Sequence, residues 1–195
     1  MGRLGRYAAV ISCLVLGLAA CKGAEERASS PNSTQASTKV EVVSSGSLAA
    51  GQPIAPPTGA VVLTMSGAIR ARNQGKNLAL DLASLERMRT TRLVTDEPFL
   101  KRRATFEGVL LSDLLAVTEV APTASKVHLT ALDDYTVDFS LADVRSSQML
   151  LATKHDGKHM AIDRAGPIRI VFPEGSKVGR NPDLWIWSVS TMQVR

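Results

Sequence analysis

The chain has 195 residues, of which 45% are hydrophobic and 21% are charged. This composition indicates one globular domain with extensions, and it excludes a wholly disordered, collagen-like or polytopic membrane protein. The net charge is only +5, too small an excess for the dense basic surface of a nucleic-acid-binding protein, so we expect no nucleic-acid partner. Aromatic residues make up 4%, and the core must therefore rest on Leu, Val, Ile, Ala and Met.

Residues 1–20 have the features of a bacterial lipoprotein signal peptide. Arg3 and Arg6 precede an apolar run of about 14 residues, shorter than the roughly 20 that span a bilayer. The next residues, Leu18-Ala19-Ala20-Cys21, resemble a lipobox, which implies cleavage before Cys21 and lipidation of that cysteine. Lys22 resembles the sorting signal for the outer membrane. We expect a lipid-anchored protein facing the periplasm; the alternative is an ordinary secretory signal in which Cys21 is incidental.

Residues 21–58 are rich in Ser, Thr, Ala, Gly and Pro, which predicts a lipidated cysteine followed by a flexible linker. Within it, residues 40–43 (VEVV) are a short apolar exception, interpreted mostly as linker, with a transient strand or docking segment as the alternative. The folded domain is expected over residues 59–195. Loss of the signal removes Cys13, and the anchor consumes Cys21, so the mature domain has no free thiol and its net charge falls to +3.

The first half of the domain predicts strands alternating with short helices. Strands are expected at residues 60–67, 78–82 and 90–95, with a turn at 73–77 and a basic loop at 99–103. Asp81 is a suitable N-cap for a helix over residues 82–88. Ser112 or Asp113 is expected to cap a second helix, whose apolar face includes Leu114 and Leu115 and which ends before Pro122.

The second half predicts two hairpins. Alternating runs at 127–131 and 135–141 flank Asp133-Asp134, and strands at 149–153 and 159–162 flank the turn 155–158. A helical turn is expected at 141–147, a strand at 168–172, a polar loop at 175–182 and a final strand over 185–192. The pattern predicts an α+β domain with a few short helices.

Five segments, taken in order, carry a family resemblance: FEGVLLSDLL (106–115), ALDDY (131–135), DGKHM (156–160), GPIRIVFP (166–173) and WIWSV (185–189). The chain resembles the oxidoreductase molybdopterin-binding domain, a sulfite-oxidase-like fold with mixed β-sheets, and most of all its small stand-alone bacterial members. In full-length enzymes of the family that this chain resembles, molybdenum is held by the dithiolene of a pterin and by one cysteine thiolate. Residues 91–95 (TRLVT) stand where that cysteine is expected, and a threonine hydroxyl is a poor substitute for a soft thiolate. We therefore expect no bound cofactor, with molybdopterin kept open by the resemblance.

The candidate ligand-binding residues form a hypothetical cationic, aromatic pocket. Arg169 within a strand offers a planar fork for an anion, and Arg92 could join it. The full set is Arg92, Thr95, Asp134, Tyr135, Arg169, Arg180 and Trp185. The alternative is scattered surface charge with a core tryptophan. Asp133 and Asp134 could form an acid–base pair or a hydrogen-bonded turn, and Lys101–Arg103 is interpreted as a solvated loop tip.

Histidines give a second, weaker hypothesis. His155 and His159, with Asp156, could hold zinc or copper, but two histidines across a hairpin turn are more often surface residues, and we expect no metal site. The sequence thus predicts a non-catalytic ligand-binding, accessory or sensory lipoprotein whose partners are the membrane and an envelope or inner-membrane protein. The alternatives are a periplasmic molybdopterin-dependent oxidoreductase, or a subunit of one, and a structural envelope lipoprotein.

Overall fold

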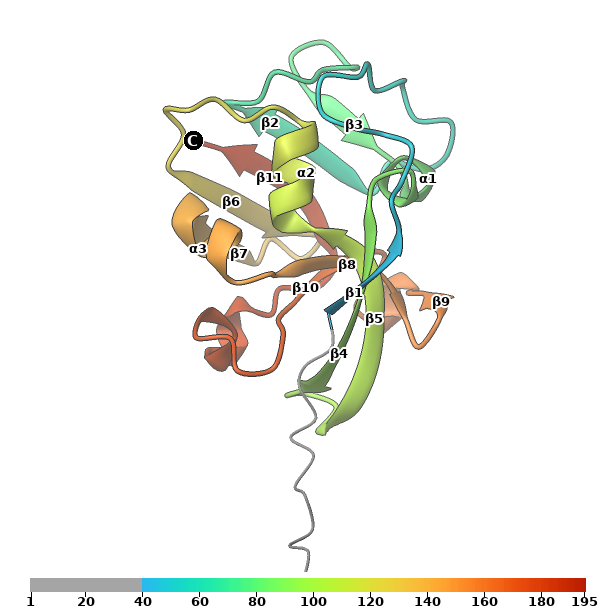
Figure 1. Cartoon of the computed structure of the whole chain (residues 1–195), viewed down its shortest axis with the longest axis vertical. Helices are drawn as coiled ribbons and strands as arrows, with labels where there is room; N and C mark the ends of the chain where they lie inside the picture. The colour runs from blue at the N-terminus through green and yellow to red at the C-terminus, as the bar shows by residue number, and fades with distance from the viewer. Residues whose placement is uncertain (1–39) are drawn as a thin grey trace, which may run out of the picture. The chain divides into compact units, whose positions relative to one another are not determined.

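The computed structural model describes residues 40–195 (Figure 1). The predicted signal peptide, Cys21 and the first part of the predicted linker lie outside the described residues. The strands are β1 (Val40–Ser44), β2 (Leu63–Gly67), β3 (Leu78–Leu80), β4 (Thr90–Glu97), β5 (Arg102–Leu110), β6 (Lys126–Ala131), β7 (Thr136–Ser140), β8 (Leu150–His155), β9 (Lys158–His159), β10 (Arg169–Val171) and β11 (Val189–Val194). The α-helices are α1 (Leu82–Glu86), α2 (Leu111–Val117) and α3 (Leu141–Ser146), and the 3-10 helices are η1 (Ile162–Arg164), η2 (Val178–Arg180) and η3 (Pro182–Leu184).

These strands form two sheets. The first has the order β1-β4-β5-β8-β10, with β9 added to β8, and all its pairs are antiparallel. The second has the order β3-β2-β11-β6-β7, in which β2 and β11 are parallel and the other pairs antiparallel. The predicted α+β class with mixed sheets is confirmed. The predicted hairpin between residues 127 and 141 is confirmed as β6 and β7.

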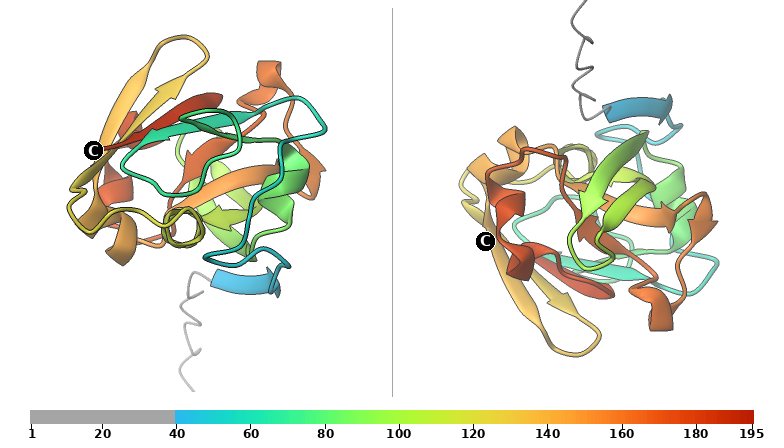
Figure 2. Two further views of the ribbon diagram at one scale, coloured as in Figure 1. Left: turned by 90° about the horizontal axis from the view of Figure 1, so that it is seen from above. Right: turned by 90° about the horizontal axis from the view of Figure 1, so that it is seen from below.

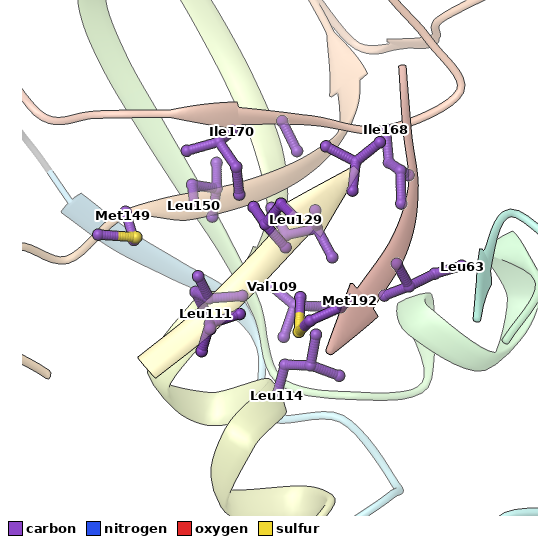
Figure 3. Close-up of a cluster of buried hydrophobic side chains, with 14 of the residues drawn as sticks. Leu63, Val109, Leu111, Leu114, Leu129, Met149, Leu150, Ile168, Ile170 and Met192 are labelled. Atoms are coloured by element: carbon purple, nitrogen blue, oxygen red, sulfur yellow. The ribbon is translucent and has the colours of Figure 1, made fainter. Parts of the chain in front are cut away.

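The core lies between the two sheets and against α2 (Figure 3). Side chains from both sheets and from α2 meet there, because alternate residues of each strand point to one face. Those labelled in Figure 3 are each at most 1% exposed: Leu63, Val109, Leu111, Leu114, Leu129, Met149, Leu150, Ile168, Ile170 and Met192. Burial of this size makes the hydrophobic effect the main stabilising contribution.

Residues 40–58 correct the predicted domain boundary. They were expected to belong to the flexible linker, but β1 pairs with β4, and Leu48 and Ile54 are only 5% and 7% exposed. The N–H groups of Ser47 and Leu48 both donate to the carbonyl of Arg87, at 2.7 and 2.9 Å. Two buried aliphatic side chains and a strand ladder offset the entropy of ordering this segment, although its composition is typical of a linker.

Of the two predicted helix N-caps, one is confirmed and the other is wrong. Asp81 caps α1 as predicted, accepting the N–H of Ser84 at 2.8 Å. Leu110, not Ser112 or Asp113, occupies the N-cap position of α2 without a side-chain capping hydrogen bond, and the helix ends at Val117. No helix within residues 40–195 is long and apolar enough to cross a bilayer.

The β4–β5 hairpin also differs from the predicted strand and basic loop. Strand β4 continues to Glu97, and β5 already begins at Arg102. Arg102 and Arg103 form ion pairs with Asp156 and Glu174, at 3.0 and 3.4 Å. Because β5 begins at Arg102, both arginines belong to a strand, and only Lys101 of the predicted basic tip lies in the turn. Figure 2 (right) views the molecule from the end where this hairpin projects.

Candidate functional site

A buried ion pair joins the end of β4 to the start of β10. Nη2 of Arg169 donates to Oε1 of Glu97 at 2.6 Å, and the two side chains are 3% and 0% exposed. The other oxygen of Glu97 accepts the backbone N–H groups of Phe99 and Leu100. The carboxylate is therefore fully engaged, while Nε of Arg169 is buried without a hydrogen-bond partner in the described part of the chain.

Aromatic rings surround the Arg169 guanidinium. Its Cζ lies 5.4 Å from the ring centroid of Phe106 and 5.1 Å from that of Trp187. Cation–π contacts of this kind favour the charged form in a dry environment. Burial lowers the pKa of Arg169 below its ordinary value, and the hydrogen bond and charge of Glu97 oppose that shift. Because arginine starts from a very high pKa, it stays charged at neutral pH.

A second polar group stands beside the ion pair. His155 stacks on Phe106 with 4.7 Å between ring centroids, and its Nε2 lies 3.4 Å from Nη2 of Arg102. The same Arg102 nitrogen donates to Asp156 at 3.0 Å. The backbone N–H of Thr105 and then the Arg102 side chain hold the pKa of Asp156 below its ordinary value. Thus Arg102 is oriented by a carboxylate that stays ionised.

The Glu97–Arg169 pair, Arg102 and His155 line a hollow of about 360 Å³, which we call the arginine hollow. Three guanidinium groups and two carboxylates contribute to it, and no carboxylate of residues 40–195 pairs with Arg164. Its lining is Glu97, Phe99, Leu100, Arg102, His155, Asp163, Arg164, Ala165, Arg169 and Trp187. A net positive hollow with aromatic walls is suited to a small anion that carries a flat or apolar part.

The structure brings only some of the predicted site residues together. Arg169 lines the arginine hollow, but Arg92 lies on the opposite face of β4, where it pairs with Glu107 at 2.8 Å. The expectation that Arg92 joins Arg169 is therefore wrong, because residues 92 and 97 are an odd number of positions apart in one strand and must point to opposite faces.

The remaining predicted residues border neighbouring hollows or the surface. Thr95, Arg180 and Trp185 line a small hollow of about 160 Å³, and Tyr135 and Trp185 line another of about 290 Å³. Asp134 is exposed in the β6–β7 turn, with a φ of 64°. Its backbone N–H donates to Ala131, as expected of a residue with a turn-forming role.

The two histidines considered as a metal pair have separate partners. Nε2 of His155 lies 3.4 Å from both Arg102 and Asp156, whereas Nε2 of His159 lies 2.7 Å from Glu86. Among residues 40–195 no group of three His, Cys, Asp or Glu side chains is arranged to hold a metal ion.

Sequence reasoning missed Glu97, Arg102, Phe106 and Trp187 as site residues. One signal was available for Glu97: the buried alternation Thr91, Leu93, Thr95 continues to position 97. An acid on a buried face requires a partner, and an arginine inside another strand is the natural candidate. The other three residues carry no such signal, since their proximity arises from segments far apart in sequence.

Comparison with known proteins gives a consistent result. A family model described as the oxidoreductase molybdopterin binding domain matches residues 72–190, more than half of the chain. Among solved structures, the sulfane dehydrogenase SoxCD from Paracoccus pantotrophus is similar, with a TM-score of 0.52 and 18% identity. That match covers 68% of this chain and 37% of the SoxCD chain, and it confirms the predicted fold. No curated protein matches this chain.

Proposed function

This chain belongs to the oxidoreductase molybdopterin-binding domain family, and from that premise we propose that it is a non-catalytic ligand-binding module of the cell envelope, anchored through a lipidated Cys21. The observation that carries this proposal is the environment of Glu97 at the C-terminal end of β4. There the Glu97 carboxylate is closed off by Arg169 and by two backbone N–H groups. A group already engaged in this way is not a free metal ligand or a free base.

Molybdenum does not fit the donor set of this domain. The matched segment 72–190 contains no cysteine, since the only two cysteines are Cys13 and Cys21. Thr95, in the strand that the family resemblance points to, is 1% exposed and offers a hard hydroxyl. Family membership keeps molybdopterin among the candidate ligands, but we derive no reaction step through it.

The arginine hollow supports binding of a small anion with an aromatic or unsaturated part. Arg164 is exposed and has no carboxylate partner within residues 40–195, and Arg102 is held in place by Asp156. Trp187 and Phe99 provide apolar walls beside these charges. A guanidinium binds the oxygens of phosphate, sulfate or carboxylate through paired hydrogen bonds, and the rings contact the rest of the ligand.

Calorimetric titration of the purified chain with phenyl phosphate and with inorganic phosphate tests this binding. We expect phenyl phosphate to bind more tightly than inorganic phosphate. Arg102→Ala and Arg164→Ala should each weaken its binding by at least about tenfold, since a charged hydrogen bond contributes about 1.5–3 kcal/mol. Arg70→Ala is the matched control, because the Arg70 side chain is 81% exposed and, among residues 40–195, forms an ion pair only with Glu119. Equal losses in all three variants would mean that the net charge of the protein, and not the hollow, attracts the anion.

The catalytic alternative has its own measurement. Protein purified from a molybdate-replete host is analysed for molybdenum and for pterin fluorescence. Molybdenum and pterin at one equivalent each, with turnover of an electron acceptor, would overturn the non-catalytic proposal even if phenyl phosphate binds as expected.

The proposed anchor is tested in cells. Globomycin, which blocks the lipoprotein signal peptidase, should cause the unprocessed form to accumulate, and a radiolabelled fatty acid should be incorporated into the chain. Cys21→Ser should abolish the label. Unchanged processing without acyl label would show that Cys21 is not lipidated.

A further inference from the structure

A second hollow adjoins the arginine hollow and shares Phe99 and Trp187 with it. Its volume is about 290 Å³, and we call it the aromatic hollow. It is lined by Phe99, Ala131, Asp133, Tyr135, Pro182, Asp183, Trp185, Ile186 and Trp187. Four of these are aromatic, which is half of the eight Phe, Tyr and Trp residues in the whole chain. Such a concentration of aromatic side chains at one hollow, in a chain with few aromatic residues, favours a ligand-binding surface.

Three separate segments form the aromatic hollow. Phe99 comes from the tip of the β4–β5 hairpin, Tyr135 from the β6–β7 hairpin, and the two tryptophans follow η3. The hydroxyl of Tyr135 donates to the carbonyl of Asp183 at 2.8 Å, and the ring of Phe99 meets that of Trp187 edge to face at 4.8 Å. Phe99, Tyr135 and Trp187 nevertheless remain 48%, 46% and 38% exposed, so their rings are held in place but not covered.

The charge of this hollow is negative. Asp133 and Asp183 both line it, and neither makes an ion pair within residues 40–195. One oxygen of Asp133 accepts the N–H of Tyr135 at 3.2 Å, which leaves the other oxygen available. The cation in contact with a ring of this hollow is Arg169, 5.1 Å from the Trp187 ring, and its charge is balanced by Glu97 at 2.6 Å. Arg102 and Arg164 line the adjoining arginine hollow, and Arg180 lines the small hollow that shares Trp185.

We propose that the aromatic hollow binds a small organic cation of the trimethylammonium class. Aromatic faces attract a cation electrostatically, and a quaternary ammonium loses less hydration on entering an aromatic site than a primary amine does. The two carboxylates add long-range attraction without requiring hydrogen-bond donors from the ligand. The lining offers only two carboxylates, and among residues 40–195 no group of three His, Cys, Asp or Glu side chains is arranged to hold a metal ion. This site involves different charged residues from the arginine hollow, so it stands apart from the proposed function.

The two tryptophans make the hollow observable. Trp185 and Trp187 are the only tryptophans of the chain, and both line it. Titration of the full chain with choline chloride, at constant ionic strength, should therefore give a saturable change in tryptophan fluorescence, with Kd in the millimolar range or tighter. Saturation-transfer NMR on the choline methyl protons provides a second, independent measurement. The neutral isostere 3,3-dimethylbutan-1-ol has the same shape without the charge and should bind at least tenfold more weakly.

Matched variants separate this site from its neighbour. The double variant Asp133→Asn/Asp183→Asn keeps side-chain shape and should weaken choline binding about tenfold, while phenyl phosphate binding is retained. Asp163→Asn, which removes a carboxylate lining only the arginine hollow, should leave choline binding unchanged, as should Arg102→Ala.

Three results would overturn the proposal. The first is the absence of both a fluorescence change and an NMR transfer up to ~50 mM choline. The second is equal binding of choline and dimethylbutanol, which would indicate a merely apolar surface. The third is binding of a lysine-rich peptide without binding of choline, which would assign the hollow to a protein partner. If the unmodified chain binds choline but not phenyl phosphate, only the proposed function is refuted.

Discussion

The Glu97–Arg169 pair offers a quantitative test of how the site is held together. Both side chains are essentially inaccessible to water, so removing one partner leaves the other charge buried and uncompensated. Such losses cost about 3–5 kcal/mol of unfolding free energy. We expect Glu97→Gln to lie near the lower end, about 3 kcal/mol, because the guanidinium retains its contacts with Phe106 and Trp187.

The reverse variant, Arg169→Met, should cost a similar amount. It leaves a carboxylate that still accepts the N–H groups of Phe99 and Leu100. The double variant Glu97→Gln/Arg169→Met removes both charges and keeps roughly the same volume, so it should cost only about 1–2 kcal/mol. The free energies of the single variants therefore should not add, and the difference of several kcal/mol measures the coupling.

Urea unfolding at pH 7, followed by far-ultraviolet circular dichroism, measures the three free energies. If a single variant does not fold, recovery of folding in the double variant carries the same information. Single losses below about 1 kcal/mol, or a double-variant loss equal to the sum of the two, would refute the reasoning, because either result means that the pair is solvated or uncoupled.

Three further predictions concern stability. The Ser84 hydroxyl and then the Gly59 N–H lower the pKa of Asp81 from 3.8 to about 2. The ionised Asp81 should therefore contribute about 1–2 kcal/mol to the free energy of unfolding above pH 4, and this contribution should be lost as the pH falls to 2. Urea unfolding across this pH range should show the loss, and Asp81→Asn should make the unfolding free energy less dependent on pH. Gly108→Ala should destabilise the protein by about 3 kcal/mol or more in thermal and urea unfolding, because its Cβ would lie 2.1 Å from a carbonyl oxygen of β8. The control Gly75→Ala has open space around the new Cβ but a φ of +59°, and it should cost about 1 kcal/mol. Equal costs for the two variants would contradict the crowding argument. A chain starting at residue 59 should be about 3–5 kcal/mol less stable than one starting at residue 40, since Leu48 and Ile54 are buried; equal midpoints in urea would restore the predicted linker boundary.

The periodicity of individual segments was sufficient for much of the fold. Alternation predicted the β6–β7 hairpin, and Asp81 was correctly placed as a helix cap. Both features depend on residues within a few positions of each other, which is the range over which sequence patterns operate. The ordered run of five motifs predicted the family that residues 72–190 match.

Patterns failed where distant segments decide the outcome. Residues 40–58 read as a linker by composition, and only the ladder with β4 and the burial of Leu48 and Ile54 show that they belong to the domain. Arg92 and Arg169 both occupy strands, yet the first is half-exposed and the second buried. Burial depends on what packs over a strand, which is a property of the assembled sheets.

The amino-acid sequence by itself determined the α+β class through local periodicity and the absence of a cysteine thiol from the matched segment through composition, and the family through the resemblance of five ordered motifs. The tertiary structure alone decided that Glu97 closes onto Arg169, and that Phe99, Tyr135 and the two tryptophans surround one hollow. Those residues lie in segments separated by tens of positions, and their proximity results from the packing of two sheets on a shared core.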